Sequence, residues 1–313
     1  MSKASEGNQP SAADWLASHV PSQAGRVFVV TGANSGLGLE TARALGSLGA
    51  TVIMTARDTA KGQAAVESLR AGQPDGDFEL RHLDLADLDS VREFAAGVDR
   101  VDVLVNNAGV MMPPRTLTEQ GYELQFGVNH LAHFALTILL FNTLLESEDP
   151  RVVTVSSALH KRGRIHFEDL QGEHGYHRNR YYAQSKLANV VFALELHRRL
   201  RTAGFALRSL LAHPGYTATN LQSAGPTGAG KLLMKVTNKV FAQDVAMGAL
   251  PQIYAAAGAD VESGQFWGPE SRNETKGFPA LVEPLDEARD REVGRKLWDI
   301  SEELTGVHID LTP

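Results

Sequence analysis

A run of four apolar residues at 27–30 leads directly into a glycine-rich turn, and this junction constrains the fold more than any other part of the chain. The turn carries glycines at 32, 36 and 38 and is followed by a helical pattern. Glycine lets the backbone turn tightly and approach a pyrophosphate, whose charge is stabilised by the amide groups at a helix N-terminus. The spacing G-x-x-x-G-x-G differs from the common G-x-G-x-x-G fingerprint. We interpret the junction as a strand, a nucleotide-binding turn and a helix.

Apolar runs of four to seven residues alternate with longer amphipathic stretches along the rest of the chain. This alternation is typical of an α/β protein with a doubly wound parallel sheet, the Rossmann arrangement. No repeat or linker divides residues 25–313, which we expect to form a single domain. We expect residues 1–24 to form a loose extension or an added helix around Trp15 and Leu16. The expected strands are 26–31, 51–55, 78–82, 101–105, 151–156, 206–212 and 264–267, and the longest expected helices are 118–147 and 180–202.

Two segments, 158–181 and 216–240, interrupt this alternation. Both follow strand carboxyl ends, the edge at which ligands bind in open α/β sheets. The second contains the sequence Gly-Pro-Thr-Gly-Ala-Gly-Lys at 225–231, but Leu232 replaces the hydroxyl residue of a phosphate loop, and no strand precedes it. We therefore predict a lid over the substrate at about 216–240.

Composition narrows the classes of function. The formal net charge is -7, which disfavours a nucleic-acid partner, and the basic run at 198–201 is interpreted as a solvated helix face. The chain has no cysteine, so it has neither a disulfide framework nor a thiolate site. Residues 1–24 do not resemble a secretory signal, and the apolar stretch 134–141 is far shorter than the ~20 residues that cross a bilayer. We predict a soluble, cytoplasmic protein without a membrane span.

Tyr182 and Lys186 lie four residues apart in a helical pattern, so their side chains share one face. A phenol has a pKa near ~10, and an adjacent ammonium favours its ionised form. Lowering that pKa by about 3 units requires roughly 4 kcal/mol, which one close cation and a positively charged cofactor could supply. We therefore expect Lys186 to lower the pKa of Tyr182 and to make it a proton-transfer group.

Several further motifs follow in order along the chain, and together they resemble the short-chain dehydrogenase/reductase family from about residue 25 to the C-terminus. They are Asn106-Asn107-Ala108-Gly109 after a strand, Asn129 in a helix, Ser156-Ser157 closing a strand, the Tyr182 and Lys186 pair, and Pro214-Gly215. Within the family, the chain most resembles the branch of retinol dehydrogenases, WW-domain oxidoreductases and protochlorophyllide reductases. That narrower likeness rests on Arg57-Asp58, on the 25 residues between Ser157 and Tyr182, and on Ser-Lys-Leu-Ala-Asn at 185–189.

The resemblance implies a hydride-transfer enzyme whose catalytic residues are Asn129, Ser157, Tyr182 and Lys186. Tyr182 would exchange the proton, Ser157 would polarise the carbonyl, and Lys186 would also hold the nicotinamide ribose. Asn129 would organise a water chain to Lys186. Adjacent strand residues point to opposite faces, so only one of Ser156 and Ser157 can serve, and the spacing to Tyr182 selects Ser157.

NADP(H) is the favoured cofactor, with NAD(H) as the alternative. Arg57 follows the second expected strand, where an arginine accommodates a 2′-phosphate and an acid binds the ribose hydroxyl. Asp58, one residue later, could weaken that preference. The residues expected to bind the cofactor are Gly32, Asn34, Ser35, Gly36, Leu37, Gly38, Arg57, Asp84, Leu85, Asn107, Ala108, Gly109, Tyr182, Lys186, Pro214, Gly215 and Thr217.

Other functions were weighed against this one. The irregularly spaced His160, His166, His174 and His177 could form a metal site, but a polar loop without metal is the favoured interpretation. A Ser157–His160 hydrolase lacks the G-x-S-x-G elbow. The alternative from another class is a catalytically idle, nucleotide-sensing protein on the same fold. The apolar residues of the expected lid either face a hydrophobic carbonyl or alcohol substrate or pack the lid onto the body of the protein, and the sequence favours neither. Retinoids, steroids, polyketides and pigments all remain open as substrates. Assembly through the long helices into a homodimer or homotetramer is also expected.

Overall fold

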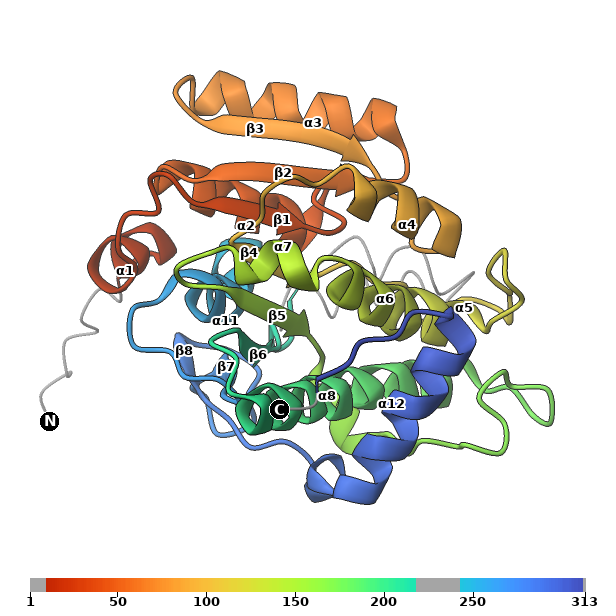
Figure 1. Cartoon of the computed structure of the whole chain (residues 1–313). Helices are drawn as coiled ribbons and strands as arrows, with labels where there is room; N and C mark the ends of the chain where they lie inside the picture. Colours follow the sequence, from red (N-terminus) through yellow and green to blue (C-terminus); the bar gives the residue numbers. More distant parts are fainter. Residues whose placement is uncertain (1–9, 218–242, 312–313) are drawn as a thin grey trace, which may run out of the picture.

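A single eight-stranded sheet forms the centre of the computed structural model, which describes residues 10–217 and 243–311 (Figure 1). The strand order is β3-β2-β1-β4-β5-β6-β7-β8, in which β1 to β7 are parallel and β8 is antiparallel to β7. The strands are β1 Val27–Val30, β2 Thr51–Ala56, β3 Asp77–His82, β4 Val103–Asn106, β5 Arg151–Val155, β6 Arg208–Ala212, β7 Phe266–Pro269 and β8 Pro279–Leu281. The order reverses between β1 and β4, which is where ligands bind in such sheets. The α/β doubly wound fold expected from the sequence is therefore confirmed.

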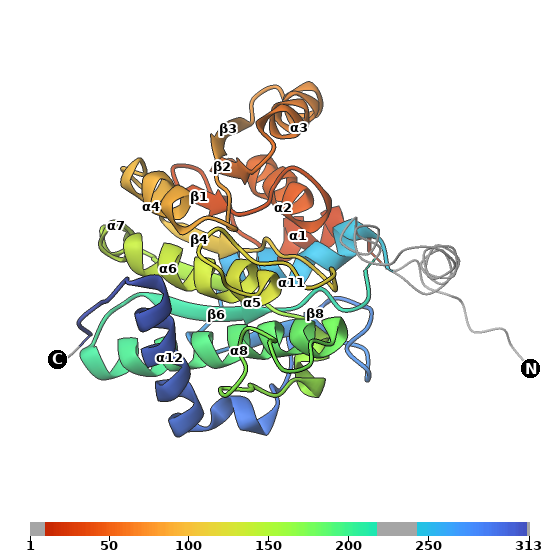
Figure 2. The same cartoon turned by 90° about the vertical axis from the view of Figure 1, so that its right-hand side faces the viewer.

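Helices cover both faces of the sheet, because successive strand residues point to opposite faces and both sets are apolar (Figure 2). Phe28 and Val30 of β1 belong to one buried cluster, and Val29 between them belongs to the other. The first face carries α1 Ala12–His19, α2 Gly36–Ser47, α3 Thr59–Gly72 and α11 Val245–Ala257. The second carries α4 Leu88–Ala96, α6 Ala132–Leu139, α8 Arg178–Ala203 and α12 Arg291–Thr305. Both layers position loops at the carboxyl edge of the strands.

The expected helix at 118–147 is wrong in its extent. Residues 117–123 form a turn closed by a bridge between Leu117 and Glu123, and Gly121 has φ +85°. The helical part is then divided into α5 Leu124–Phe126, a π-helical turn at Gly127–Leu131, α6 and α7 Phe141–Leu145. The strand β8, which has only three residues and begins with Pro279, was not expected either.

The first described residues form a helix rather than a loose extension. The hydroxyl of Ser11 accepts a hydrogen bond from the amide of Asp14, whose side chain in turn accepts one from the Ser11 amide, so α1 begins with a capping box. Trp15 of α1 packs edge-on against Tyr254 of α11 and stacks on Phe278.

The expected lid at 216–240 lies outside the described residues, except for Tyr216 and Thr217. Among the helices of the described ranges, none combines the length and the apolar character that crossing a bilayer requires.

Candidate active site

The glycine turn between β1 and α2 packs closely against the loop that follows β4. Gly32 and Gly36 have φ values of +65° and +56°, which favour glycine. A Cβ on Gly32 would lie 2.9 Å from the Cβ of Ala108, and one on Gly38 would lie 2.6 Å from Nδ2 of Asn107. Any larger residue at these two positions would therefore push the loop after β4 away from the turn.

The N-terminus of α2 is open to an anion. Ser35 occupies the N-cap position, but its side chain makes no capping hydrogen bond, and the first turn carries no acidic residue. Asn34 precedes this cap, while Gly36 and Leu37 begin the helix. Amide groups at a helix start that no side chain satisfies are suited to bind phosphate. The residues at this turn therefore fit the pyrophosphate of a dinucleotide.

A buried hydrogen-bond network connects the glycine turn to Asn129. The hydroxyl oxygen of Thr31 accepts hydrogen bonds from the amides of Asn107 and Ala108, each at 2.9 Å. Nε2 of His133 is 2.9 Å from the same hydroxyl, and its Nδ1 is 3.1 Å from the carbonyl oxygen of Asn129. Because a carbonyl only accepts, Nδ1 carries the proton and Nε2 accepts from Thr31. His133 thus connects two loops that are far apart in sequence.

Asn129 lies in the π-helical turn and is completely buried. Its Oδ1 accepts from the amide of Val110 at 2.7 Å, and its Nδ2 donates to the carbonyl of Val110 at 3.0 Å and to Oγ of Ser185 at 2.9 Å. A Cβ on Gly109 would lie 3.1 Å from Oδ1 of Asn129 and 3.5 Å from Nζ of Lys186. Isolated π-helical turns inside helices are frequent at functional sites.

Tyr182 and Lys186 project from the first half of α8 and are both buried. The side chain of Ser157, the second residue after β5, lies close enough to the Tyr182 hydroxyl to act on its pKa. Nζ of Lys186 donates to the carbonyl of Val155, the last residue of β5, at 3.0 Å. Ser157, Tyr182, Lys186 and Asn129 therefore meet at one point of the carboxyl edge, beside Gly109.

The protein groups by themselves do not lower the pKa of Tyr182; the expected lowering also calls on a positively charged cofactor. Burial raises the pKa of Tyr182 to about 12, and the nearby side chain of Ser157 only partly opposes that rise. Burial also lowers the pKa of Lys186 to about 8. Desolvation disfavours both charged forms, and the ammonium is directed to the Val155 carbonyl. At neutral pH these groups keep Tyr182 protonated.

The adjacent serines after β5 have different partners. The hydroxyl of Ser156 donates to the carbonyl of Lys186 at 2.8 Å and so fastens α8 to the sheet. The hydroxyl of Ser157 accepts from the amide of Leu159 at 3.2 Å and lies near the hydroxyl of Tyr182. Of the two, Ser157 is thus the serine that contacts Tyr182.

His160 is not placed to activate Ser157 as a nucleophile. Its Nδ1 is 2.7 Å from the backbone carbonyl of Ser157, and its Nε2 accepts from the amide of Leu285 at 3.3 Å. Both ring nitrogens are therefore occupied away from the serine hydroxyl. Across residues 10–217 and 243–311, no three His, Cys, Asp or Glu side chains are grouped to hold a metal; His166 pairs with Glu168 and His174 with Asp169.

The residues expected at the adenosine end of the cofactor lie at the ends of β2 and β3. Arg57 follows β2 and is exposed. Asp58 caps α3: its carboxylate accepts from the Lys61 amide at 3.0 Å and lies 2.8 Å from the Lys61 ammonium. Asp84 and Leu85 follow β3, where the Asp84 carboxylate accepts from the Ala86 amide at 2.9 Å. These positions are separate from the residues around Tyr182 but share the same sheet edge.

The loop after β6 carries Pro214, Gly215 and Thr217. The hydroxyl of Thr217 donates to the Pro214 carbonyl at 2.7 Å, as does the side-chain amide of Gln243 at 2.9 Å. Gly215 has φ +65°, and a Cβ there would lie 2.5 Å from the carbonyl oxygen of Thr275. The structure thus holds this loop beside the 271–277 segment.

Three residues that support the site were not identified from sequence. They are His133, Ser185 and Gln252. The side-chain amide of Gln252 donates to Oδ1 of Asn107 at 3.0 Å and to the hydroxyl of Thr41 at 2.6 Å. The only available signal for His133 was its position four residues after Asn129, on the same helical face. Gln252 gave no signal, because α11 meets the glycine turn only in the folded chain.

An open parallel sheet with a nucleotide-binding turn at its switch point and a Tyr–Lys pair beside it defines a dehydrogenase of the Rossmann class. The family model for short chain dehydrogenases matches residues 26–228. The chain belongs to this family and is an oxidoreductase that acts on alcohols or carbonyls with a nicotinamide cofactor.

Relatives extend over nearly the whole chain. Mouse retinol dehydrogenase 14 is 43% identical over 300 residues, covering 90% of this chain and 86% of the relative. Mouse polyprenol dehydrogenase is 41% identical over 302 residues, covering 92% and 86%. These similarities confirm the resemblance to the retinol dehydrogenase branch.

Solved structures show the same fold. A Mycobacterium paratuberculosis protein of uncharacterised function is 44% identical, with a TM-score of 0.79 over 96% of this chain and 98% of that one. A Beutenbergia cavernae protein described as an NAD(P)-dependent gluconate 5-dehydrogenase, with NADP bound at low occupancy, is 29% identical. Its TM-score is 0.60 over 78% of this chain and 95% of that one.

Proposed function

We propose that the protein is an NADP(H)-dependent oxidoreductase that interconverts an apolar alcohol and its carbonyl, with Tyr182 as the general acid and base. The observation that carries the proposal is the meeting of Tyr182, Ser157, Lys186 and Asn129 beside Gly109 at the open sheet edge. When bound, the nicotinamide supplies or accepts the hydride. The protein groups must then bind the substrate oxygen and move one proton.

Each side chain has a role that its contacts support. Tyr182, protonated at neutral pH, donates its proton to the substrate oxygen during reduction and removes it during oxidation. The Ser157 hydroxyl stabilises developing charge on that oxygen through a hydrogen bond. Lys186 supplies a positive charge one helical turn from Tyr182, and Asn129 fixes the loop at Val110 and α8 through Ser185.

Two residues between the end of β2 and the start of α3 support the proposed preference for NADP(H). Arg57 is exposed at the position where a 2′-phosphate would lie. Asp58 is the residue that could have favoured NAD(H), but both of its carboxylate oxygens contact Lys61 in the cap of α3. An acid occupied in this way competes poorly for a ribose hydroxyl.

The names of two relatives support an apolar substrate. Retinol and polyprenol, for which they are named, are both alcohols on long hydrocarbon chains. We therefore propose an alcohol or aldehyde of this chemical class.

A test of the function compares wild type with Tyr182→Phe on retinal, a polyprenal and a small polar ketone. We expect NADPH oxidation with the apolar aldehydes and a loss of turnover of about 10²- to 10⁴-fold in Tyr182→Phe. Tyr182→Phe should still bind NADPH, which fluorescence titration measures. Tyr181→Phe is the matched control, because its hydroxyl donates to the Asp169 carbonyl at 2.8 Å, away from the site.

The proposal would be overturned if wild type bound NADPH but reduced no carbonyl, or if both tyrosine variants were equally active. A higher kcat/KM with NADH than with NADPH would overturn the cofactor preference alone.

A further inference from the structure

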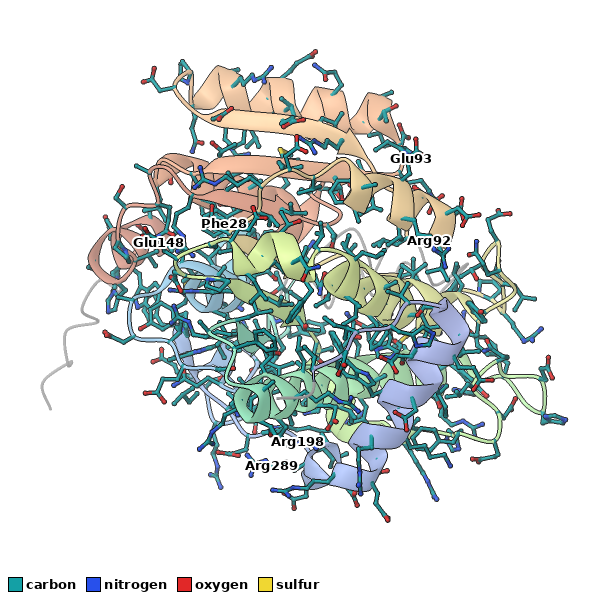
Figure 3. All side chains as sticks on the ribbon, in the orientation of Figure 1. Phe28, Arg92, Glu93, Glu148, Arg198 and Arg289 are labelled. Atoms are coloured by element: carbon teal, nitrogen blue, oxygen red, sulfur yellow. The ribbon has the colours of Figure 1, made fainter. Side chains whose placement is uncertain are left out.

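A hollow of about 690 Å³ lies between the second half of α8 and the first half of α12, and arginines dominate its lining. The residues that define this arginine pocket are Arg198, Arg199 and Arg201 from α8 and Arg291 and Arg295 from α12. Arg198 is labelled at the lower side of the molecule in Figure 3, where α8 and α12 lie side by side. At 1.5 Å per residue, Arg198 lies roughly 18 Å along α8 from Lys186, so the pocket is distinct from the catalytic site.

The positive charge of the pocket is largely unmatched. One carboxylate, that of the buried Glu195, lines it; this group contacts Arg198 and lies 2.7 Å from Nε of Arg199. In the two described stretches of the chain, no ion pair includes Arg201, Arg291 or Arg295. Asp299 also lies 3.9 Å from Arg199, so five guanidinium groups meet two carboxylates here in a protein whose net charge is -7.

Two of the arginines are held in place by the helix packing. The guanidinium of Arg199 lies 4.3 Å from the ring centroid of Trp298. The guanidinium of Arg198 lies over Gly294, where a Cβ would approach its Nη2 to 2.3 Å. Arg291 and Arg295 are close enough that their charges help to lower the pKa of Arg198, after the larger effect of burial. The pocket is thus preformed, and a bound anion would relieve the repulsion within it.

We propose that the arginine pocket binds a small anion that carries two or more phosphate groups. The planar fork of guanidinium donors matches phosphate oxygens in pairs. The volume lies within the range of small-molecule sites. Arg201, Arg291 and Arg295 have no carboxylate partner among the described residues, and the Nη groups of Arg295 stay available while its Nε donates to the Arg291 carbonyl at 3.3 Å. Arg198 and Arg199 pair with Glu195, and Arg199 also with Asp299. The basic run at 198–201 is then part of a binding site, not simply a solvated face.

The test uses pyrophosphate as the probe on the full-length protein, with isothermal titration calorimetry at constant ionic strength. We expect saturable binding that weakens at least about tenfold in the double variant Arg291→Gln/Arg295→Gln, because two charge-assisted groups are lost. Both side chains are exposed on α12, so the variant should keep the thermal midpoint of wild type. Arg272→Gln, an exposed arginine outside the pocket, is the matched control and should bind like wild type.

Three results would overturn the proposal. The first is no saturable binding of pyrophosphate to wild type. The second is binding that Arg57→Gln weakens and the double variant leaves unchanged, which would place the probe in the cofactor site, at the end of β2. The third is selective binding to vesicles of phosphatidylserine over phosphatidylcholine, lost in the double variant and insensitive to pyrophosphate, which would assign the arginines to a membrane surface.

Discussion

His133 joins the glycine turn to Asn129 through two buried hydrogen bonds. Its Nε2 accepts a hydrogen bond from the hydroxyl of Thr31, which in turn accepts one from the Asn107 amide in the loop after β4. Its Nδ1 donates to the backbone carbonyl of Asn129. Burial lowers the pKa of His133 to about 4, so the neutral form that this arrangement needs is present at physiological pH. A side chain that never reaches the substrate can therefore decide how accurately the reacting groups are placed.

His133→Leu removes both hydrogen bonds, although the Thr31 hydroxyl keeps those from the amides of Asn107 and Ala108. We expect kcat to fall at least about tenfold and stability to fall by roughly 0.5–1.5 kcal/mol for each hydrogen bond lost. Steady-state kinetics and urea unfolding measure the two effects. His133→Gln, which keeps a donor and an acceptor, should restore part of the activity.

The matched control for this variant is His130→Leu on the same stretch of helix. His130 is equally buried, but its Nε2 bonds to Ser301 of α12, away from the site. This variant should lose stability and retain its turnover. Equal losses of kcat in the two leucine variants would show that His133 has only a packing role.

At the scale of elements, the amino ends of three strands are held together by one carboxylate. Asp149 lies 3.3 Å from the guanidinium of Arg26 before β1 and 2.6 Å from that of Arg151 in β5, and it also contacts Arg208 in β6. Arg151 is almost completely buried, and burial lowers its pKa to about 10. This cluster lies at the opposite edge of the sheet from the active site, so its role is to fix the strands.

Asp149→Asn should destabilise the fold by about 1–3 kcal/mol. A fully buried charge left without its partner costs roughly 3–5 kcal/mol, and Asp149 is one-third exposed, which reduces the penalty. Glu283→Gln, which breaks the exposed pair with Arg289, should change stability by less than ~1 kcal/mol. Urea unfolding distinguishes the two, and similar values for both variants would contradict the assigned role of Asp149.

The sequence predicted helices and strands well where the local pattern was strong, and poorly where tertiary contacts determine the structure. The glycine turn, seven strands and the long α8 carry hydrophobic runs or glycines that act locally. The π-helical turn around Asn129 and the three-residue strand β8 have no such pattern. His133 and Gln252 could not be identified because their partners come from distant segments. Burial, which raises the pKa of Tyr182, is likewise decided by tertiary packing and gives no local signal in the sequence.

For the molecule as a whole, three buried histidines make stability depend on pH. Burial lowers the pKa of His130 to about 3 and those of His133 and His160 to about 4, from an ordinary value of 6.5. Between about pH 4 and pH 6.5, these histidines bind protons in the unfolded chain but stay neutral in the folded chain. Stability is therefore complete above about pH 6.5 and is lost as the pH falls toward 4.

Urea unfolding at pH 7.0, 6.0 and 5.0 should show this loss directly. Each histidine that stays neutral when folded contributes a slope of up to about 1.4 kcal/mol per pH unit. The buried Glu123, whose pKa is raised, opposes the trend in part. His130→Leu should reduce the slope, and a protein equally stable at pH 5 and 7 would contradict the prediction.

The antiparallel strand β8 is an edge strand of the sheet, and its residues hinder a second molecule from adding a strand there. It is three residues long, and Pro279 lies opposite Pro269 of β7, so two amide donors are missing from this short ladder. A second molecule could not continue the sheet along such a border with a regular set of hydrogen bonds. Copies of the protein should accordingly not pair by extending the sheet at this border, and growth into extended β-aggregates from this side is discouraged.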